Sequence, residues 1–477
     1  MGPILNLLWV ISLAVQPWDG LRPTGAEPAA LKEPMPSGKI SAEQDQGIPR
    51  SDFKIKVNVE LVPVDVTVYG TPVRDLQAED FIVYDNKAAQ PVIYFSRDQL
   101  PLAVAMVVDS SGSLTAYLPE LRAAAHSALG TLKAEDQVVL FGFAAFPARL
   151  TDFSHDHDPI VQTLVSFKTA GSTNIWDALF VAAHYLRSQA ADRRRAIILI
   201  SDNGQIVNWG QTWQSARQEL LEAGATLYAI ETLGTGSLYA ESDSVRRIAA
   251  DTGGEALSVS SGQLLAAALN RSISYLRMQY TLGFAPPAGK QDGAFHDLSV
   301  ALKNANLCPD CRLHARKGYY AGTPPPADAS NRQQRKVPPG TRVEFAVYDR
   351  ITVAAADMVE VDDIPFEIKT ARPPGAWDRL LTRVDLRIDA AKVRFRMANG
   401  LHTASLCIAL FSALSDGVFF ATDWKVVDVQ LKEDEYQQTL KSGIAYTAQI
   451  RGAPDTLKAV VCDLQSDAIG SKRVRTR

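Results

Sequence analysis

Between residues 102 and 254, short apolar runs alternate with segments whose apolar residues recur at helical spacing. The first run, Ala103–Val108, is continuously apolar, as expected of a strand buried on both faces of a sheet. Three further runs follow intervening helical segments: Gln137–Phe143, Ala196–Ile200 and Ala225–Ile230. This alternation predicts a doubly wound, Rossmann-like α/β domain with a mostly parallel sheet. We assign it residues 99–260.

The helical segments of this domain are marked by apolar residues three or four positions apart. Leu118, Leu121, Ala125, Leu129 and Leu132 predict the first helix. Further helices are expected from Ile175 to Leu186, at Gln211–Ala223 and around Val245–Ala249. Arg149–Phe153 is expected to form a short antiparallel edge strand.

Strand patterns flank the α/β domain on both sides. Phe53–Tyr69 alternates between apolar and polar residues, although Pro63 predicts an interruption or an edge position. After a helix near Leu264–Leu276, strand patterns return up to Tyr320. We expect the β segment 53–98 to pair with residues 277–322 of the helix-plus-β segment 261–322. The α/β domain would then be an insertion into a β domain.

The C-terminal part reads as a separate β domain. Pro324-Pro325-Pro326 opens a linker, residues 323–340. From Val343 onwards strand-like runs alternate with turns and no strong helix is evident, so residues 341–477 are expected to be an all-β, sandwich-like domain. Its expected strands are Val384–Ile388, Val393–Met397, Ser405–Phe411, Trp424–Leu431 and Leu457–Cys462.

The N-terminus has the pattern of a Sec-type signal peptide. Ile4–Val15 is apolar apart from two polar residues, and small residues at Thr24-Gly25-Ala26 suit cleavage after residue 26. Residues 27–52 read as a disordered linker. We therefore expect a secreted, periplasmic or cell-envelope protein. A disordered start or a wrongly chosen start codon is the alternative, because no Lys or Arg precedes the apolar run. No other stretch reaches eighteen uninterrupted apolar residues, so no transmembrane helix is expected in the mature chain.

Charge and cysteine content narrow the function further. The 477 residues carry a net charge of −4, and nucleic-acid binding needs a basic surface, so no nucleic-acid partner is expected. Four cysteines suit an exported protein with one or two disulfides. Cys308 and Cys311 share an expected hairpin loop, where zinc would need a second pair of ligands. Cys407 and Cys462 lie in strand-like runs, where buried free thiols are the alternative.

Oxygen-bearing side chains follow the first buried strand directly, in Asp109-Ser110-Ser111-Gly112-Ser113. Ligands of open α/β sheets bind beyond the carboxyl ends of the strands. One carboxylate and several hydroxyls suit a hard divalent cation, Mg²⁺ first and Mn²⁺ or Ca²⁺ next. Alone, this pattern is also a good turn or helix cap.

Two other expected loops offer the same chemistry. Thr173 precedes the second helix, and Asp202 follows the strand that ends at Ile200. Each residue alone could cap a helix or satisfy a turn. Three such loops in register with buried strands favour one metal site with Asp109, Ser111, Ser113, Thr173 and Asp202 as ligands.

This ligand pattern resembles the metal-ion-dependent adhesion site (MIDAS) of von Willebrand factor type A (vWA) domains. In that family, Asp-x-Ser-x-Ser, a threonine from a Gly-x-Thr loop and a later aspartate bind Mg²⁺ or a similar ion. The resemblance implies that Asp109, Ser111, Ser113, Thr173 and Asp202 take these roles. Ser201–Gln205 departs from the family, whose members often have glycine and acidic residues after the aspartate.

The resemblance extends beyond the domain, over about residues 53–322, to an exported VWFA-related family of acidobacterial type. The segments that carry it are Val57–Pro72, Ala78–Phe81, Gly171–Leu179, Thr252–Gly254 and Arg316–Tyr320. It implies a protein-binding or adhesion module in which the ion keeps one open position for an Asp or Glu carboxylate of a protein partner. The oligomeric state is not indicated.

Two rival functions remain open. A hydrolase on the Rossmann-like sheet would need Ser111 as nucleophile with His126 or His155 as base, but the chain lacks a nucleophile elbow and a phosphate loop. We therefore expect no enzyme activity. The loop around His155 and Asp158 could also hold a weak second metal, although a solvated loop is the simpler interpretation. The second rival is a structural envelope protein with a vestigial metal site.

Overall fold

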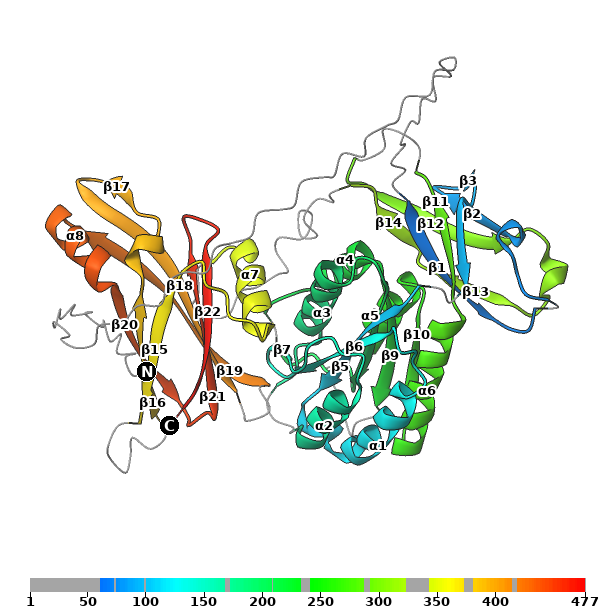
Figure 1. Ribbon diagram of the computed structural model, residues 1–477, viewed down its shortest axis with the longest axis horizontal. Helices are drawn as coiled ribbons and strands as arrows, with labels where there is room; N and C mark the ends of the chain where they lie inside the picture. The colour runs from blue at the N-terminus through cyan, green and yellow to red at the C-terminus, as the bar shows by residue number, and fades with distance from the viewer. Residues whose placement is uncertain are drawn as a thin grey trace, which may run out of the picture. The chain divides into compact units, whose positions relative to one another are not determined.

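The computed structural model of the chain describes residues 61–476, apart from 73, 98–99, 168–171, 208, 233–240, 287–291, 323–342, 373–380 and 414–417. The expected signal peptide, the linkers at 27–52 and 323–340, and the start of the first expected strand, including Val57 and Val59, lie outside the described residues. Figure 1 gives the labels of the helices and strands used below.

The α/β domain has one six-stranded sheet, in the order β10-β9-β8-β5-β6-β7. Neighbouring strands from β10 to β6 are parallel, and β7 is antiparallel to β6. The prediction of a mostly parallel sheet is confirmed. The antiparallel edge strand overlaps the expected Arg149–Phe153 only at Arg149, so its expected position was largely wrong. The strands are β5 (Leu102–Asp109), β6 (Gln137–Phe143), β7 (Pro147–Arg149), β8 (Arg194–Ser201), β9 (Ala225–Thr232) and β10 (Glu255–Val259).

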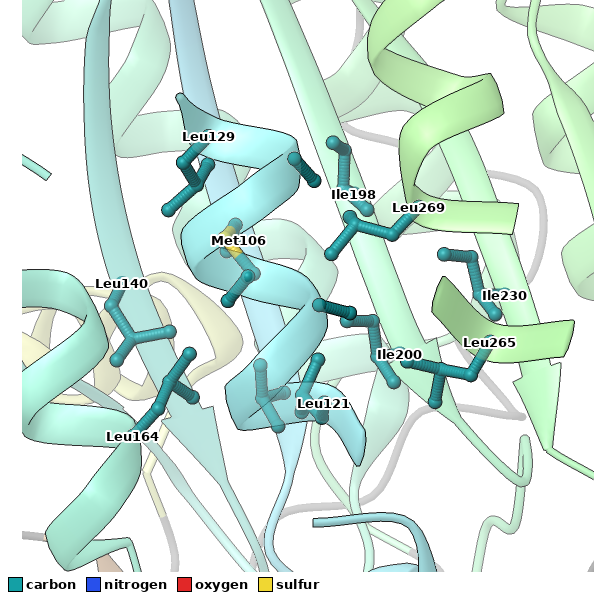
Figure 2. Packing of buried hydrophobic residues seen from close by; sticks show 14 of the residues in the cluster. Met106, Leu121, Leu129, Leu140, Leu164, Ile198, Ile200, Ile230, Leu265 and Leu269 are labelled. Carbon is teal, nitrogen blue, oxygen red and sulfur yellow. The ribbon is translucent and has the colours of Figure 1, made fainter. Parts of the chain in front are cut away.

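Helices cover both faces of this sheet, because alternate residues of the buried strands point to opposite sides. Met106 and Ile198 pack under one set of helices, together with Leu121, Leu164 and Leu269 (Figure 2). Ala105 and Ile197 face the other set. The first set is α1 (Leu118–Leu129), α2 (Asp158–Ser166) and α6 (Gly262–Met278); the second is α3 (Ile175–Gln189), α4 (Trp213–Ala223) and α5 (Ser242–Asp251).

Strands from both sides of the α/β domain form common sheets. β1 (Val62–Tyr69) lies between β11 (Tyr280–Phe284) and β13 (Arg312–Ala315), antiparallel to both. Val64 and Leu282, opposite each other, are fully buried in their shared core. The remaining strands are β4 (Tyr94–Arg97) beside β11, and a second sheet of β14 (Gly318–Tyr320), β12 (Phe295–Leu302), β2 (Phe81–Asp85) and β3 (Ala88–Gln90).

The C-terminal part is rich in strands, and two of its sheets contribute to one core. Val384, Leu386 and Ile388 pack with Leu406 and Ile408 in a single buried cluster. The first sheet has β15 (Phe366–Ala371), β16 (Leu381–Ile388) and β20 (Ile444–Arg451). The second has β17 (Arg396–Ala398), β18 (Leu401–Ala413), β21 (Thr456–Asp463) and β22 (Ile469–Arg475), with β19 (Phe419–Leu431) paired to β18.

The expectation that no helix follows Val343 is wrong at two places. α7 spans Phe345–Ala356, and α8 spans Glu433–Ser442. The β-branched and aromatic residues of α7 imitate a strand, but Val347, Tyr348, Ile351 and Ala355 recur at helical spacing and are buried. These residues pack with β18 and with Ala145 and Phe146 of the α/β domain, so the environment of the segment decides its structure.

Candidate metal site

Asp109 is the last residue of β5, which lies between β8 and β6 in the middle of the sheet. Its side chain is fully buried. Oδ1 of Asp109 accepts a hydrogen bond from the backbone N–H of Ser111 at 2.7 Å, and Oδ2 accepts one from the hydroxyl of Ser201 at 2.7 Å. The carboxylate is therefore anchored to its own loop and to the end of the neighbouring strand β8.

The loop after Asp109 is also tied to the end of β6. Ser110 donates its backbone N–H and its hydroxyl to the carbonyl oxygen of Phe143, at 2.8 and 2.9 Å. Ser111 then precedes a 3-10 turn, Gly112–Tyr117, that leads into α1. Ser113 lies in this turn, and its side chain is outside what the structure describes.

Asp202 directly follows Ser201, the last residue of β8, whose hydroxyl contacts Asp109. It is half-buried, and its Oδ1 accepts the backbone N–H of Gly204 at 3.0 Å. Burial raises the pKa of Asp109 to about 6, the hydrogen bonds from Ser201 and Ser111 oppose this shift, and the negative charge of Asp202 adds to it. Asp202 is thus an electrostatic neighbour of Asp109.

Thr173 is buried in the loop before α3. Its carbonyl oxygen accepts the backbone N–H groups of Ile206 and Val207, at 3.0 and 3.2 Å, so this loop is joined to the loop that carries Asp202. The backbone N–H of Asn174 donates to the carbonyl oxygen of Ala144 at 2.8 Å, next to the residue that Ser110 contacts. All three loops therefore meet at the carboxyl edge of the sheet.

The expected ligands differ in how directly they contact Asp109. Asp109 is joined directly to Ser111, and Asp202 acts on it through charge. Among the described residues, no hydrogen bond joins the side chain of Thr173 to Asp109; the connection runs through the loop backbones.

Comparison with known proteins identifies the domain that carries these loops. The family described as von Willebrand factor type A domain matches residues 104–205, which include Asp109, Ser111, Ser113, Thr173 and Asp202. The chain carries a vWA domain. No curated protein matches the sequence.

Three of the solved structures that match the chain are as follows. BatB from Bacteroides thetaiotaomicron is 19% identical, covers 36% of this chain and 97% of its own, and has a TM-score of 0.31. A von Willebrand factor type A protein from Catenulispora acidiphila is 10% identical, with coverages of 56% and 74% and a TM-score of 0.34. Proximal thread matrix protein 1 of the mussel byssus, described with a zinc-occupied MIDAS motif, is 16% identical, with coverages of 40% and 49% and a TM-score of 0.33.

Two residues of the candidate site were missed by the sequence analysis. Ser201 orients Asp109, and its position at the end of an apolar strand was a usable signal. Asn203 is buried with a positive φ of 57°, and neither polar atom of its side chain has a hydrogen-bond partner among the described residues. No local pattern predicts a buried, unpaired amide, because its burial comes from elements distant in the sequence.

The residues present fit a hard divalent cation. Asp109 and Asp202 are neighbouring carboxylates, and among the described residues neither pairs with a Lys, Arg or His side chain. A buried carboxylate without a positive partner is costly, and a bound cation removes that cost. The surrounding donors are hydroxyl and amide oxygens, which Mg²⁺, Mn²⁺ and Ca²⁺ accept.

The four cysteines divide into one disulfide pair and two free thiols. Cys308 and Cys311 form a disulfide, so the alternative of zinc held by their thiolates has no ligands there. Cys407 and Cys462 are free and buried, and burial raises the pKa of both thiols, to about 12 and about 11. Within the described part of the chain, no helix is long and apolar enough to cross a membrane.

Proposed function

We propose that the vWA domain is a metal-ion-dependent protein-binding module of MIDAS type, with Asp109, Ser111, Ser113, Thr173 and Asp202 around one divalent cation. Mg²⁺ is the first choice, with Mn²⁺ or Ca²⁺ as alternatives, because the donors are oxygens with few negative charges. The observation that carries the proposal is the buried carboxylate of Asp109, oriented by Ser111 and Ser201 and close to the charge of Asp202.

The donor set also determines what the bound ion would do. Two carboxylates would balance the charge of a divalent ion, and the three hydroxyls add none, so the site has no excess negative charge to repel an incoming carboxylate. Five protein ligands would also leave one position of a six-coordinate ion open. Such an ion attracts a further anionic oxygen. A glutamate or aspartate side chain of a protein partner is the group we propose for the open position, so that adhesion depends on the metal.

A catalytic role for the same site has little support. His155 contacts Gln137 and the carbonyl oxygen of Asp136, at the start of β6, whereas Ser111 lies near the end of that strand. A strand of this length separates its ends by about 20 Å, too far for His155 to take a proton from Ser111. His126 lies in the last turn of α1, on its exposed side. We propose that the protein is not an enzyme.

We also propose that the protein acts outside the cytoplasm, in the cell envelope or as a secreted protein, as its N-terminal segment predicts. A structural envelope protein with an inactive metal site is the second candidate. Asn203 favours a metal site that binds its ion over this alternative. A buried amide without a hydrogen-bond partner is hard to explain in a loop with a purely structural role.

The test is partner capture with the immobilised full-length protein. Envelope extract is applied in Mg²⁺, in Mg²⁺ with excess chelator, and in Mg²⁺ with the Asp109→Ala variant. The control is Asp434→Ala, which removes an exposed carboxylate from α8. We expect proteins that bind in the first condition and to the control, and are lost in the other two. Recovery of the same proteins in chelator would contradict metal-dependent binding and support the structural alternative.

A further inference from the structure

A cavity of about 160 Å³ lies at the opposite end of β8 from the proposed metal site. β8 runs from Arg194 to Ser201; Ser201 contacts Asp109, and Arg194 and Arg195 line the cavity. Asp65 of β1 and Arg316, just after β13, close the cavity from the flanking β sheet. Its volume is large enough for several water molecules or a small ligand. The cavity lies between the vWA domain and the sheet into which this domain is inserted.

Two guanidinium groups converge in this cavity at Gly224, the residue between α4 and β9. A Cβ atom placed on Gly224 would lie 3.3 Å from Nη2 of Arg195 and 3.7 Å from Nη1 of Arg316. Gly224 also has a positive φ of 58°, as the cap of α4 requires. The two arginines therefore come from different sheets but direct their ends toward one point.

The guanidinium groups are only partly satisfied by the protein. Nη1 of Arg195 donates to the carbonyl oxygens of Ala190 and Ala191, while its Nε is buried without a partner. Nε of Arg316 is also buried without a partner, and among the described residues no hydrogen bond from the Arg316 side chain is found. Its guanidinium instead lies over the ring of Tyr319, 5.9 Å from the centroid.

Negative charge in the cavity does not balance these arginines. The charge of Asp65 acts on both arginines, but its Oδ1 accepts the hydroxyl of Thr281 at 2.6 Å, and among the described residues it forms no ion pair with Arg195 or Arg316. Asp192 also lines the cavity, as do Arg193 and Arg194, which donate to backbone carbonyl groups. Burial, and then the charge of Arg195, lower the pKa of Arg316 to about 10, while Asp65 opposes the shift.

We propose that this cavity is a binding site for a small oxyanion, a carboxylate or a phosphate group of a small molecule, held between Arg195 and Arg316. A guanidinium donates two parallel N–H bonds to such groups, and a site with two guanidiniums can hold both sides of one anion. The ligand would supply the charge and the acceptors that Nε of each arginine lacks. The site is independent of the proposed metal-dependent function.

The experiment is isothermal titration of the full-length protein with inorganic phosphate and, separately, with succinate, at ionic strength balanced with NaCl. Arg316→Gln removes one guanidinium and should weaken binding at least about tenfold. Asp65→Asn keeps the acceptor for Thr281 but removes the competing charge, so it should tighten binding several-fold. Arg312→Gln, an exposed arginine of β13, is the matched control for loss of one positive charge.

The two variants are expected to change the affinity for the anion in opposite directions, so Asp65→Asn still tests the proposal if Arg316→Gln fails to fold. Binding of both probes supports the shared oxyanion chemistry, and binding of one assigns phosphate or carboxylate. Failure of both probes to bind, or an Asp65→Asn variant that binds no tighter than the wild type, overturns the proposal. Asp109→Ala should bind the anions unchanged, which separates this site from the metal site.

Discussion

The hydroxyl of Ser201 donates to Oδ2 of Asp109 at 2.7 Å, across the boundary between two neighbouring parallel strands. Ser111 donates to the other oxygen of the same carboxylate, so both oxygens of Asp109 are held. A carboxylate with fixed orientation loses little freedom when it binds an ion, and this favours affinity. Ser201 is therefore a positioning residue for the proposed metal site.

Ser201→Ala tests this positioning role. The substitution removes one hydrogen bond to a charged group, worth about 1.5–3 kcal/mol, and we expect the affinity for Mn²⁺ to fall at least about fivefold. The measurement is isothermal titration, with Ser188→Ala on the exposed face of α3 as control. An affinity equal to that of the wild type, in a protein with an unchanged melting temperature, would show that Ser201 has no such role.

Tyr348 joins α7 to the vWA domain. Its hydroxyl donates to Oδ2 of the buried Asp177 at 2.5 Å, and Oδ1 of Asp177 accepts the backbone N–H of Gln211 at 2.7 Å. Tyr348→Phe leaves a buried carboxylate with one donor fewer, so we expect a loss of about 1–3 kcal/mol in the free energy of unfolding.

Urea denaturation measures this loss for Tyr348→Phe. The control is Tyr446→Phe in β20, whose hydroxyl has no hydrogen-bond partner among the described residues. Equal stabilities of the two variants would mean that the contact between Tyr348 and Asp177 contributes nothing to folding.

Lys458 in β21 is fully buried, and its ammonium donates to the carbonyl oxygen of Asp357. Burial, and then the charge of Arg473, lower the pKa of Lys458 to about 7. The unfolded chain keeps its lysine pKa near about 10.4, so between these values the unfolded state binds more protons and stability rises with pH. Below pH 7 the folded protein bears the full cost of a buried ammonium.

Lys458→Met should remove this cost. We expect the variant to melt at least about 3 °C above the wild type at pH 6, and the difference to shrink as the pH rises to 9. Differential scanning calorimetry across this range makes the comparison, with the exposed Lys425→Met as control. A variant less stable than the wild type at pH 6 would show that the contact with Asp357 outweighs the cost of burial.

Val64→Asp tests the insertion of the vWA domain into the flanking β structure. Val64 is fully buried in β1, opposite Leu282 of β11, and a buried charge there should cost more than about 4 kcal/mol. Hydrogen exchange should show loss of protection in β1, β11 and β13 together, whereas Leu61→Asp, an exposed neighbour, should leave them protected. Protection lost in β1 alone would contradict a shared folding unit.

The buried strands of the vWA domain were predictable because their side chains are apolar on both faces. The expected run Gln137–Phe143 coincides with β6, and the expected Ala103–Val108 lies inside β5. Some strands of the C-terminal part were also recognisable, as at Leu457–Cys462 within β21, where only Lys458 interrupts the apolar residues. Local pattern and burial agree in these segments. The expected strand Val393–Met397 was largely wrong, because β17 begins only at Arg396.

Other features depend on contacts that no local pattern reveals. α7 was missed because its Val, Ile and Tyr residues favour strands, and only packing against β18 and the vWA domain makes it a helix. α8 was also missed, although the sequence carried a signal for it. Glu433 begins this helix and Lys441 lies in its last turn, as the helix dipole favours. In the candidate site, the types of ligand could be predicted from the sequence. The contact between Ser201 and Asp109 could not, because it depends on the register in which two strands pair.

Metal titration of the full-length protein tests the central claim most directly. Isothermal titration with Mg²⁺ and Mn²⁺ is made on the wild type, on Asp109→Ala, and on Asp434→Ala, a control that removes an exposed carboxylate from α8. The account predicts one ion per chain in the wild type and in the control, and no binding by a folded Asp109→Ala variant. Binding of the same ion with unchanged affinity by Asp109→Ala, or no binding by the wild type at millimolar ion, would contradict it.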